Sequence, residues 1–171
     1  MSAPKHGRVS MLASALLLSG AALAAAAAPE VQRTPLPAGF DTVFVSGALP
    51  SVSKQDAPKG SVEAYGDMET QATSALTSLK GTLARLGLSM GDVVKMTVFM
   101  VADPTKDNKL DFAGLMAAYT KFFGTAEQPN KPARSAVQVA ALVVPGALVE
   151  IEVVAAKPHD GPGHTAPAKP R

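Results

Sequence analysis

The sequence predicts an α+β domain in which a mixed sheet is covered on one face by two helices. Two amphipathic helical patterns alternate with runs rich in β-branched residues, and two further runs of that kind close the domain. The order is therefore strand, helix, strand, helix, strand, strand. Two helices on one face of a mixed sheet bury such elements economically. The domain spans residues 39–156, and a domain this small favours association of copies.

The first strand and the first helix have clear boundaries. Residues 41–46 form a short β-rich run that ends at Gly47 and Pro50. Asp67 is a candidate N-cap, and Gly87 is a C-terminal stop. Between them, apolar residues recur at steps of three and four, namely Met68, Ala72, Ala75, Leu76, Leu79, Leu83 and Leu86.

The second strand and the second helix follow the same logic. Residues 93–101 are β-branched and aromatic, which predicts a strand, and Lys95 within it is a solvated or subunit-interface lysine. Residues 111–123 form an amphipathic helix that ends at Gly124. One face of this helix carries Phe112, Leu115, Met116, Tyr119 and Phe122, and core packing is expected for Tyr119 and Phe122.

The two closing strands are expected to pair as a hairpin. They cover residues 135–141 and 148–156, and a Pro145-Gly146 turn lies between them. In such a hairpin Glu150 lies opposite residue 141, so Arg134 lies roughly 20 Å away at the strand rise. The two charges should therefore not meet within one subunit.

Three charged residues stand out in these otherwise apolar strands. Arg134 precedes one strand, and Glu150 and Glu152 lie inside the other. Such charges cost free energy unless they are paired or used. The glutamates are two positions apart and should share one face of their strand, with Cα atoms roughly 6.5–7 Å apart. The strands therefore hold either a structural ion pair of Arg134 with a glutamate or a site for a small anionic ligand.

The ends of the chain differ from the domain. Residues 1–28 have a short basic start and a long run of small apolar residues, which predicts a cleaved signal peptide and a periplasmic protein; an uncleaved anchor is the alternative. Residues 29–38 are an extended lead-in, and residues 157–171 are a disordered, proline-rich tail. Cleavage removes two of the 16 basic residues and leaves 14 against 14 acidic ones. Neither nucleic acid nor a stable membrane contact is expected of the cleaved protein.

Composition excludes several kinds of chemistry. The three histidines are His6, His159 and His164, all outside the predicted domain, and the chain has no cysteine. A histidine general base, a cysteine nucleophile and a Cys/His metal site are therefore not expected in the domain. The remaining arginine, lysine, carboxylate, hydroxyl and backbone groups suit recognition of a small carboxylate and acid–base chemistry through water.

Several short segments of the domain form a recognisable set, namely residues 43–50, 93–99, 110–112, 131–135 and 149–152, with Tyr119, Phe122 and Phe123. In their order and spacing these segments resemble the reactive-intermediate deaminase family, also called the translation-inhibitor endoribonucleases. The resemblance implies a chorismate-mutase-like fold and a homotrimer with clefts between subunits. It also implies hydrolysis of 2-aminoacrylate-type enamines and imines to 2-keto acids and ammonia, without a cofactor or a metal.

The resemblance also implies roles for individual residues. The arginine that matches Arg134 binds the substrate carboxylate, and the glutamate that matches Glu150 positions the attacking water. Ser46 and Gly47 supply hydroxyl and backbone contacts to the cleft, although Ser46 can equally be a turn serine. Ala136 stands where the family has a cysteine two residues after the arginine, and we predict it as a further substrate-binding position.

Two functions stay open. The first is the imine deaminase, and the second is a non-catalytic trimer that binds small carboxylates or a protein partner. The second is favoured by departures from the family pattern, since residues 34–39 lack the usual tyrosine and Leu110 replaces an asparagine. Chorismate mutase activity is a weaker third hypothesis, because a dianionic substrate needs several cations and the domain has few arginines.

Overall fold

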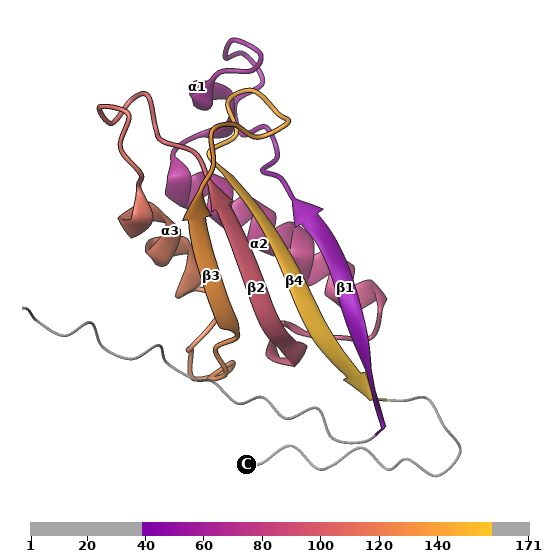
Figure 1. The fold of residues 1–171 in the computed structure, drawn as a ribbon. Helices are drawn as coiled ribbons and strands as arrows, with labels where there is room; N and C mark the ends of the chain where they lie inside the picture. Colours follow the sequence, from indigo (N-terminus) through magenta and orange to yellow (C-terminus); the bar gives the residue numbers. More distant parts are fainter. Residues whose placement is uncertain (1–38, 159–171) are drawn as a thin grey trace, which may run out of the picture. The chain divides into compact units, whose positions relative to one another are not determined.

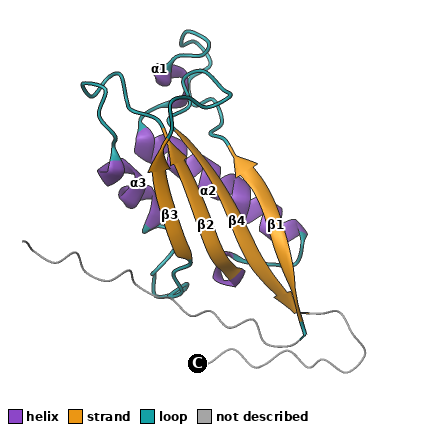
Figure 2. Cartoon of the chain, viewed as in Figure 1, coloured by secondary structure: helices purple, strands orange, loops and turns teal. Residues whose placement is uncertain are grey.

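A four-stranded mixed sheet forms the centre of the computed structural model, which describes residues 39–158 (Figures 1 and 2). The strands lie in the spatial order β1-β4-β2-β3. β4 is antiparallel to both of its neighbours, and β2 is parallel to β3. The predicted signal peptide, the lead-in and the tail beyond residue 158 lie outside the described residues. The strands are β1 (Phe40–Ala48), β2 (Val93–Met100), β3 (Ala133–Gln138) and β4 (Val149–Pro158).

Two helices, α2 (Met68–Arg85) and α3 (Phe112–Tyr119), cover one face of this sheet (Figure 1). The predicted α+β class with two helices on one face is confirmed. Two short helices were not predicted. α1 (Val62–Tyr65) lies in the loop after β1, and η1 (Met90–Asp92) leads into β2. No helix within residues 39–158 is long and apolar enough to span a membrane.

Helix α2 follows its sequence pattern closely. The Asp67 carboxylate accepts a hydrogen bond from the Thr70 N–H at 2.9 Å, which confirms the predicted N-cap. Gly87 has a φ of +75°, the left-handed conformation that ends helices. The predicted apolar positions are buried except Leu86, which is 44% exposed because it lies just past the last turn.

Helix α3 is shorter than the predicted residues 111–123. Its N-cap is Asp111, which accepts from the Gly114 N–H at 2.9 Å, and the helix ends at Tyr119. Two tight turns follow, in which the Tyr119 carbonyl accepts from the N–H groups of Phe122 and Phe123. Phe112, at the first helical position, is 45% exposed, although the sequence pattern places it on the same helix face as Leu115.

The predicted hairpin of the two closing strands is wrong. β4 lies between β1 and β2, and β3 pairs in parallel with β2 at the sheet edge. The helix-facing residues of β4 are almost completely buried, whereas most of β3 is exposed. The most apolar strand thus takes the central position, where both of its edges are paired. β4 also continues through Pro158, two residues past the expected end of the domain.

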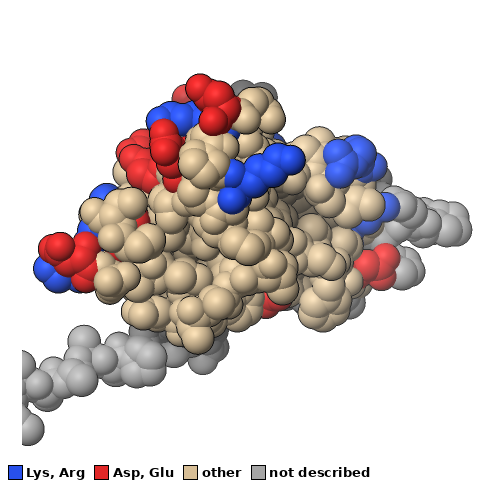
Figure 3. Space-filling view, turned by 90° about the horizontal axis from the view of Figure 1, so that it is seen from above, with Lys and Arg blue, Asp and Glu red and all other residues tan. Residues whose placement is uncertain are grey.

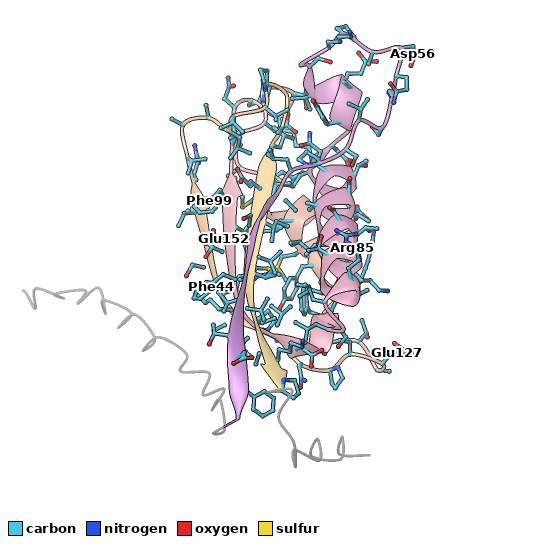
Figure 4. The ribbon with its side chains drawn as sticks, turned by 90° about the vertical axis from the view of Figure 1, so that its right-hand side faces the viewer. Phe44, Asp56, Arg85, Phe99, Glu127 and Glu152 are labelled. Carbon is cyan, nitrogen blue, oxygen red and sulfur yellow. The ribbon has the colours of Figure 1, made fainter. Side chains whose placement is uncertain are left out.

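No helix within residues 39–158 covers the other face of the sheet. Alternation along the strands places Phe44, Phe99 and Glu152 on this outer face, and Figure 4 shows all three directed away from the helices. Phe44 is 79% exposed and Val137 is 44% exposed. Figure 3 looks onto the molecule from above, at one end of the sheet, and shows a broad uncharged area between scattered charged side chains.

A polar row crosses the middle of this outer face. Register pairs Glu152 with Thr97, and Thr97 with Ser135. Lys95 lies two residues before Thr97 on the same face of β2, and its amino group donates to the Ser135 hydroxyl at 3.0 Å. The outer face therefore combines apolar side chains at its ends with hydroxyl and charged groups between them.

Candidate functional site

Arg134 lies beneath helix α3 at the edge of the sheet. Its Cα is paired with that of Met96, a buried residue that faces the helices, so Arg134 extends toward the same side. The guanidinium carbon lies 4.3 Å from the centre of the Tyr119 ring and 5.8 Å from that of Phe112. Nη2 donates to the Met116 sulfur at 3.3 Å. Aromatic and thioether groups thus surround the cation.

The charge of Arg134 has no carboxylate partner among residues 39–158. The ion pairs there are Lys54–Glu63, Lys106–Asp111, Lys109–Asp107 and Lys121–Glu69. Nη1 is buried and makes no hydrogen bond. A structural ion pair of Arg134 with Glu150 or Glu152 is therefore not formed within the chain. A buried cationic donor without a partner is costly, and an anionic ligand would remove that cost.

Ala136 lies on the same strip as Arg134. Its Cα is paired with that of Val98, which faces the helices as Met96 does. Because α3 does not cover this end of β3, Ala136 is exposed. The structure thus brings together the predicted arginine and the predicted alanine along the outer strand.

Glu150 belongs to a second group with Ser46 and Gly47. It is paired with Phe99 and extends to the outer face, and Glu152 shares that face as predicted. Ser46 and Gly47 lie in an irregularity of the β1–β4 register between Val45 and Ala48.

Glu150 packs directly against the backbone of Gly47. A Cβ atom on Gly47 would lie 2.8 Å from the Glu150 Cδ and nearer still to Oε1. Glycine is thus needed here for close approach and not for a special backbone angle, since its φ is not in the left-handed range.

The two groups do not meet within one chain. β2 separates β3 from β4, and the register partners Met96 and Phe99 are three residues apart. With strands about 4.8 Å apart and a rise of about 3.3 Å per residue, the Cα atoms of Arg134 and Glu150 are about 14 Å apart. Their side chains also leave opposite faces of the sheet. The hairpin premise was wrong, but the expectation of no intrachain contact is confirmed.

A buried glutamine fixes the segment that leads to Glu150. Gln71 of α2 is fully buried. Its amide nitrogen donates to the carbonyls of Gly66 at 2.8 Å and Gly146 at 3.1 Å, and its oxygen accepts from the Leu148 N–H at 2.7 Å. Sequence reasoning missed this residue, although its spacing from Met68 and Ala75 places it on the apolar stripe of the helix.

Sequence reasoning also missed the contacts of α3 with Arg134. Phe112, Met116 and Tyr119 follow the spacing i, i+4, i+7 and so share one helix face. That face meets Arg134 as well as the core. The spacing identifies the face that these residues share, but it does not identify the strand that this face covers.

Two hollows mark the surface, and the larger is not at the predicted site. It has a volume of about 1130 Å³ and lies between the C-terminal end of α2, η1 and residues 121–130. The smaller, of about 360 Å³, lies between β1 and α2 and includes Ser46 and Gly47. Neither includes Arg134 or Glu150. We locate the candidate site at the Arg134 guanidinium, because an unpartnered buried donor indicates a ligand and the volume of a hollow does not.

Fold and site together define a small α+β protein. On one side of its sheet, Arg134 contacts the Tyr119 ring and has no carboxylate partner among residues 39–158; on the other side, Glu150 packs against Gly47. The family description "Endoribonuclease L-PSP" matches residues 36–157. The chain belongs to this family, and the predicted membership of the reactive-intermediate deaminases is confirmed.

Relatives of known name cover most of the chain. A RutC family protein of Haemophilus influenzae is 38% identical over 133 residues, which are 78% of this chain and 90% of that protein. The 2-iminobutanoate/2-iminopropanoate deaminase of Escherichia coli is 37% identical over 133 residues, 78% of this chain and 91% of its own. The crystal structure of Escherichia coli TdcF with bound serine is 34% identical, with a TM-score of 0.53, and covers 76% of this chain and 89% of that one.

Proposed function

We propose that the protein hydrolyses enamine and imine intermediates of the 2-aminoacrylate type to 2-keto acids and ammonia, in a cleft shared by two copies of the chain. One observation carries the proposal: the Arg134 guanidinium is held in place while its buried Nη1 has no partner. A planar guanidinium pairs bidentately with a carboxylate. The relative named as an iminobutanoate and iminopropanoate deaminase acts on small imines that carry such a group.

The reaction needs little beyond orientation and proton transfer. Arg134 binds the carboxylate of the imino acid, and an exposed strip at Ala136 borders it. A water held by Glu150 of a second copy adds to the carbon of the protonated imine, and Glu150 accepts the proton that this water loses, which gives an aminoalcohol. Glu150 returns that proton to the amine nitrogen. The C–N bond then breaks to release ammonia while Glu150 takes the hydroxyl proton, which leaves the 2-keto acid; the ammonia leaves as ammonium with that proton. An enamine first tautomerises to the imine. Such assistance typically contributes about 10²–10⁴-fold.

A homotrimer would complete this cleft. Arg134 and Glu150 leave opposite faces of the sheet, so one chain supplies only half of the proposed site. The outer sheet face exposes Phe44 and Val137 and offers a surface for other copies of the same chain. A closed cyclic assembly repeats one such contact between each neighbouring pair.

The activity is tested with 2-iminopropanoate generated in situ and 2-keto acid formation as the readout. Wild-type protein should accelerate keto acid release, and Arg134→Ala should abolish the acceleration. Arg85→Ala is the matched control, because Arg85 lies on α2 and donates only to Thr82. Arg134→Ala with wild-type activity, in a folded oligomer, would remove the enzyme proposal.

A mixing experiment tests whether the cleft is shared. Arg134→Ala should be inactive, and Glu150→Gln should keep only a small residual rate. After unfolding and refolding an equal mixture, random assembly gives about a quarter of the clefts both intact residues from different chains, so about a quarter of the activity should return. Recovery of none would show that both residues serve one chain.

A non-catalytic carboxylate-binding trimer is the second candidate function. It is favoured by the surroundings of Arg134, which are the rings of Phe112 and Tyr119 and the Met116 sulfur, with no carboxylate nearby. Wild-type protein that binds pyruvate through Arg134 yet leaves imine hydrolysis at its uncatalysed rate would establish this function.

We also propose that the protein is exported to the periplasm with loss of residues 1–28. The basic start and the following apolar run support this proposal. The mass of the protein from the periplasmic fraction of a bacterial host would test it, since a full-length mass would contradict cleavage.

A further inference from the structure

The aromatic and thioether contacts of Arg134 form a defined seat for its guanidinium. We infer that this seat, made of the Tyr119 ring and the Met116 sulfur, positions Arg134 for carboxylate binding, and that Tyr119 acts through its ring and not through its hydroxyl. The inference deepens the proposed function and rests on it for the identity of the ligand. It makes Tyr119 and Met116 positioning residues.

The ring of Tyr119 is itself packed against a second ring. Tyr119 and Phe123 stack with ring centres 5.0 Å apart and an angle of 23° between their planes. Tyr119 is 6% exposed, and Phe123 is fully buried. Phe123 and the Arg134 guanidinium thus both pack against the Tyr119 ring. A ring fixed in this way gives the cation above it little freedom to move.

The seat contacts the guanidinium through an aromatic ring and a sulfur atom, and neither of these neutralises its charge. The centre of the Tyr119 ring lies 4.3 Å from the guanidinium carbon, and the Met116 sulfur accepts a hydrogen bond from Nη2. The attraction between a cation and a ring face is independent of any carboxylate, so the seat orients Arg134 without neutralising it. Nη1 remains buried without a partner. We assign this unpartnered donor to the ligand carboxylate, while the contact of Nη2 with the Met116 sulfur fixes the plane of the guanidinium.

The hydroxyl of Tyr119 has no part in this arrangement. Within the described part of the chain, the side chain of Tyr119 contacts Phe123 and Arg134 through its ring, and its hydroxyl makes no hydrogen bond. Burial raises the pKa of this phenol, and nearby Arg134 lowers it by a smaller amount. The phenol is therefore neutral near neutral pH. Phenylalanine should replace tyrosine here without loss.

The experiment compares Tyr119→Phe with Tyr119→Leu. Pyruvate serves as the carboxylate probe and is titrated by NMR, while KM and kcat are measured with 2-iminopropanoate. Tyr119→Phe should keep every value within about twofold of wild type, because phenylalanine retains the ring face. Tyr119→Leu should raise the pyruvate Kd and the KM about tenfold with little change in kcat, the pattern of lost ground-state binding.

Two further variants keep the test decisive. Met116→Leu conserves side-chain volume and removes the sulfur acceptor, so a two- to threefold weaker pyruvate affinity is expected even if Tyr119→Leu fails to fold. Tyr65→Leu, in the distant helix α1, should change neither constant. Thermal unfolding and the mass of the oligomer confirm that each variant is intact.

The outcomes separate this inference from the proposed function. Folded Tyr119→Leu or Met116→Leu protein with wild-type pyruvate affinity would overturn the seat. A fall in kcat for Tyr119→Phe would show that the hydroxyl takes part and would overturn it too. Wild-type protein that fails to hydrolyse the imine, but binds pyruvate in a manner dependent on Arg134 and Tyr119, would refute the deaminase and support the seat.

Discussion

Replacing Gly47 with alanine should disable the site through Glu150 while leaving the fold intact. The new Cβ would lie 2.8 Å from the Glu150 Cδ and 2.9 Å from its Cγ. Carbon atoms rest at about 3.5–4.0 Å, so the carboxyl carbon must withdraw by about 0.7–1.2 Å. A misplacement of about 1 Å at a reacting group can cost about 10²-fold. We therefore expect kcat/KM for 2-iminopropanoate to fall about 10- to 100-fold.

Stability should hardly change, because the atoms displaced belong to the end of a flexible side chain and Gly47 has no positive φ. Gly81→Ala is the matched control. In that helix the nearest atom to the new methyl group is the Arg85 Nη1 at 3.9 Å. This control should raise the free energy of unfolding by about 0.5–1 kcal/mol with activity unchanged.

A double variant identifies the cause of the loss. If Gly47→Ala acts by moving Glu150, it should cost nothing further in protein that already carries Glu150→Gln, because the displaced group is then no longer functional. The steric reasoning is refuted if the two losses multiply, or if Gly47→Ala alone keeps the wild-type rate while Glu150→Gln does not.

Three other substitutions test separate parts of the structure. Gln71→Leu leaves the Leu148 N–H and the carbonyls of Gly66 and Gly146 without their partner, so urea unfolding should show a loss of about 2–4 kcal/mol; a loss below that of an ordinary surface change would contradict the role of this glutamine. Asp111→Asn retains a capping side chain but removes the carboxylate charge. The hydrogen bond from Lys106, and to a smaller extent the one from the Gly114 N–H, lowers the pKa of the Asp111 carboxyl below its ordinary value of 3.8. A lowered folded-state pKa stabilises above the unfolded value and loses that effect as pH falls through the folded value, so the variant should be less stable than wild type at pH 7 and show a flatter decline below about pH 4 in urea midpoints. Phe44→Glu should convert the oligomer to monomers in light scattering, because it buries a charge in the proposed interface, whereas Val52→Glu, in the loop after β1, should leave the mass unchanged.

The parts of the fold that depend on local pattern could be predicted from the sequence. The Asp67 cap, the stripe from Met68 to Leu83 and the stop at Gly87 depend on neighbouring residues, and the structure has all three. The strand at Val93 follows from β-branched content in the same way. Local patterns also placed Glu150 and Glu152 on one face, because a strand alternates with a period of two.

Strand order could not be predicted from the turn between the last two strands. A Pro145-Gly146 turn suits a hairpin, yet the loop around it carries the chain past β2 to insert β4 beside β1. That choice depends on how much apolar surface each strand can bury on both edges, which is a property of the whole sheet. The end of α3 was missed for a similar reason, since buried Phe123 completes the apolar pattern from a turn and not from the helix.

Half of the candidate site was visible in the sequence and half was not. Arg134 and Glu150 were found as charges in apolar strands. The seat made by Tyr119 and Met116 was predicted as core only, because a helical stripe does not say which strand it covers. The fit of Glu150 over Gly47 depends on a register irregularity at Val45–Ala48 that no residue in the sequence announces.

The central place of β4 has a consequence for how the domain folds. β1 pairs with β4 alone, and the link between β1 and the β2–β3 pair also runs through β4. Until the last strand of the domain is available, the first strand has no partner and the sheet cannot close. Contacts of such long sequence separation slow folding and leave open strand edges exposed in the meantime. Synthesis of nearly the whole domain must therefore precede its folding, and a chain cut before Val149 should expose apolar strands instead of forming a smaller stable unit.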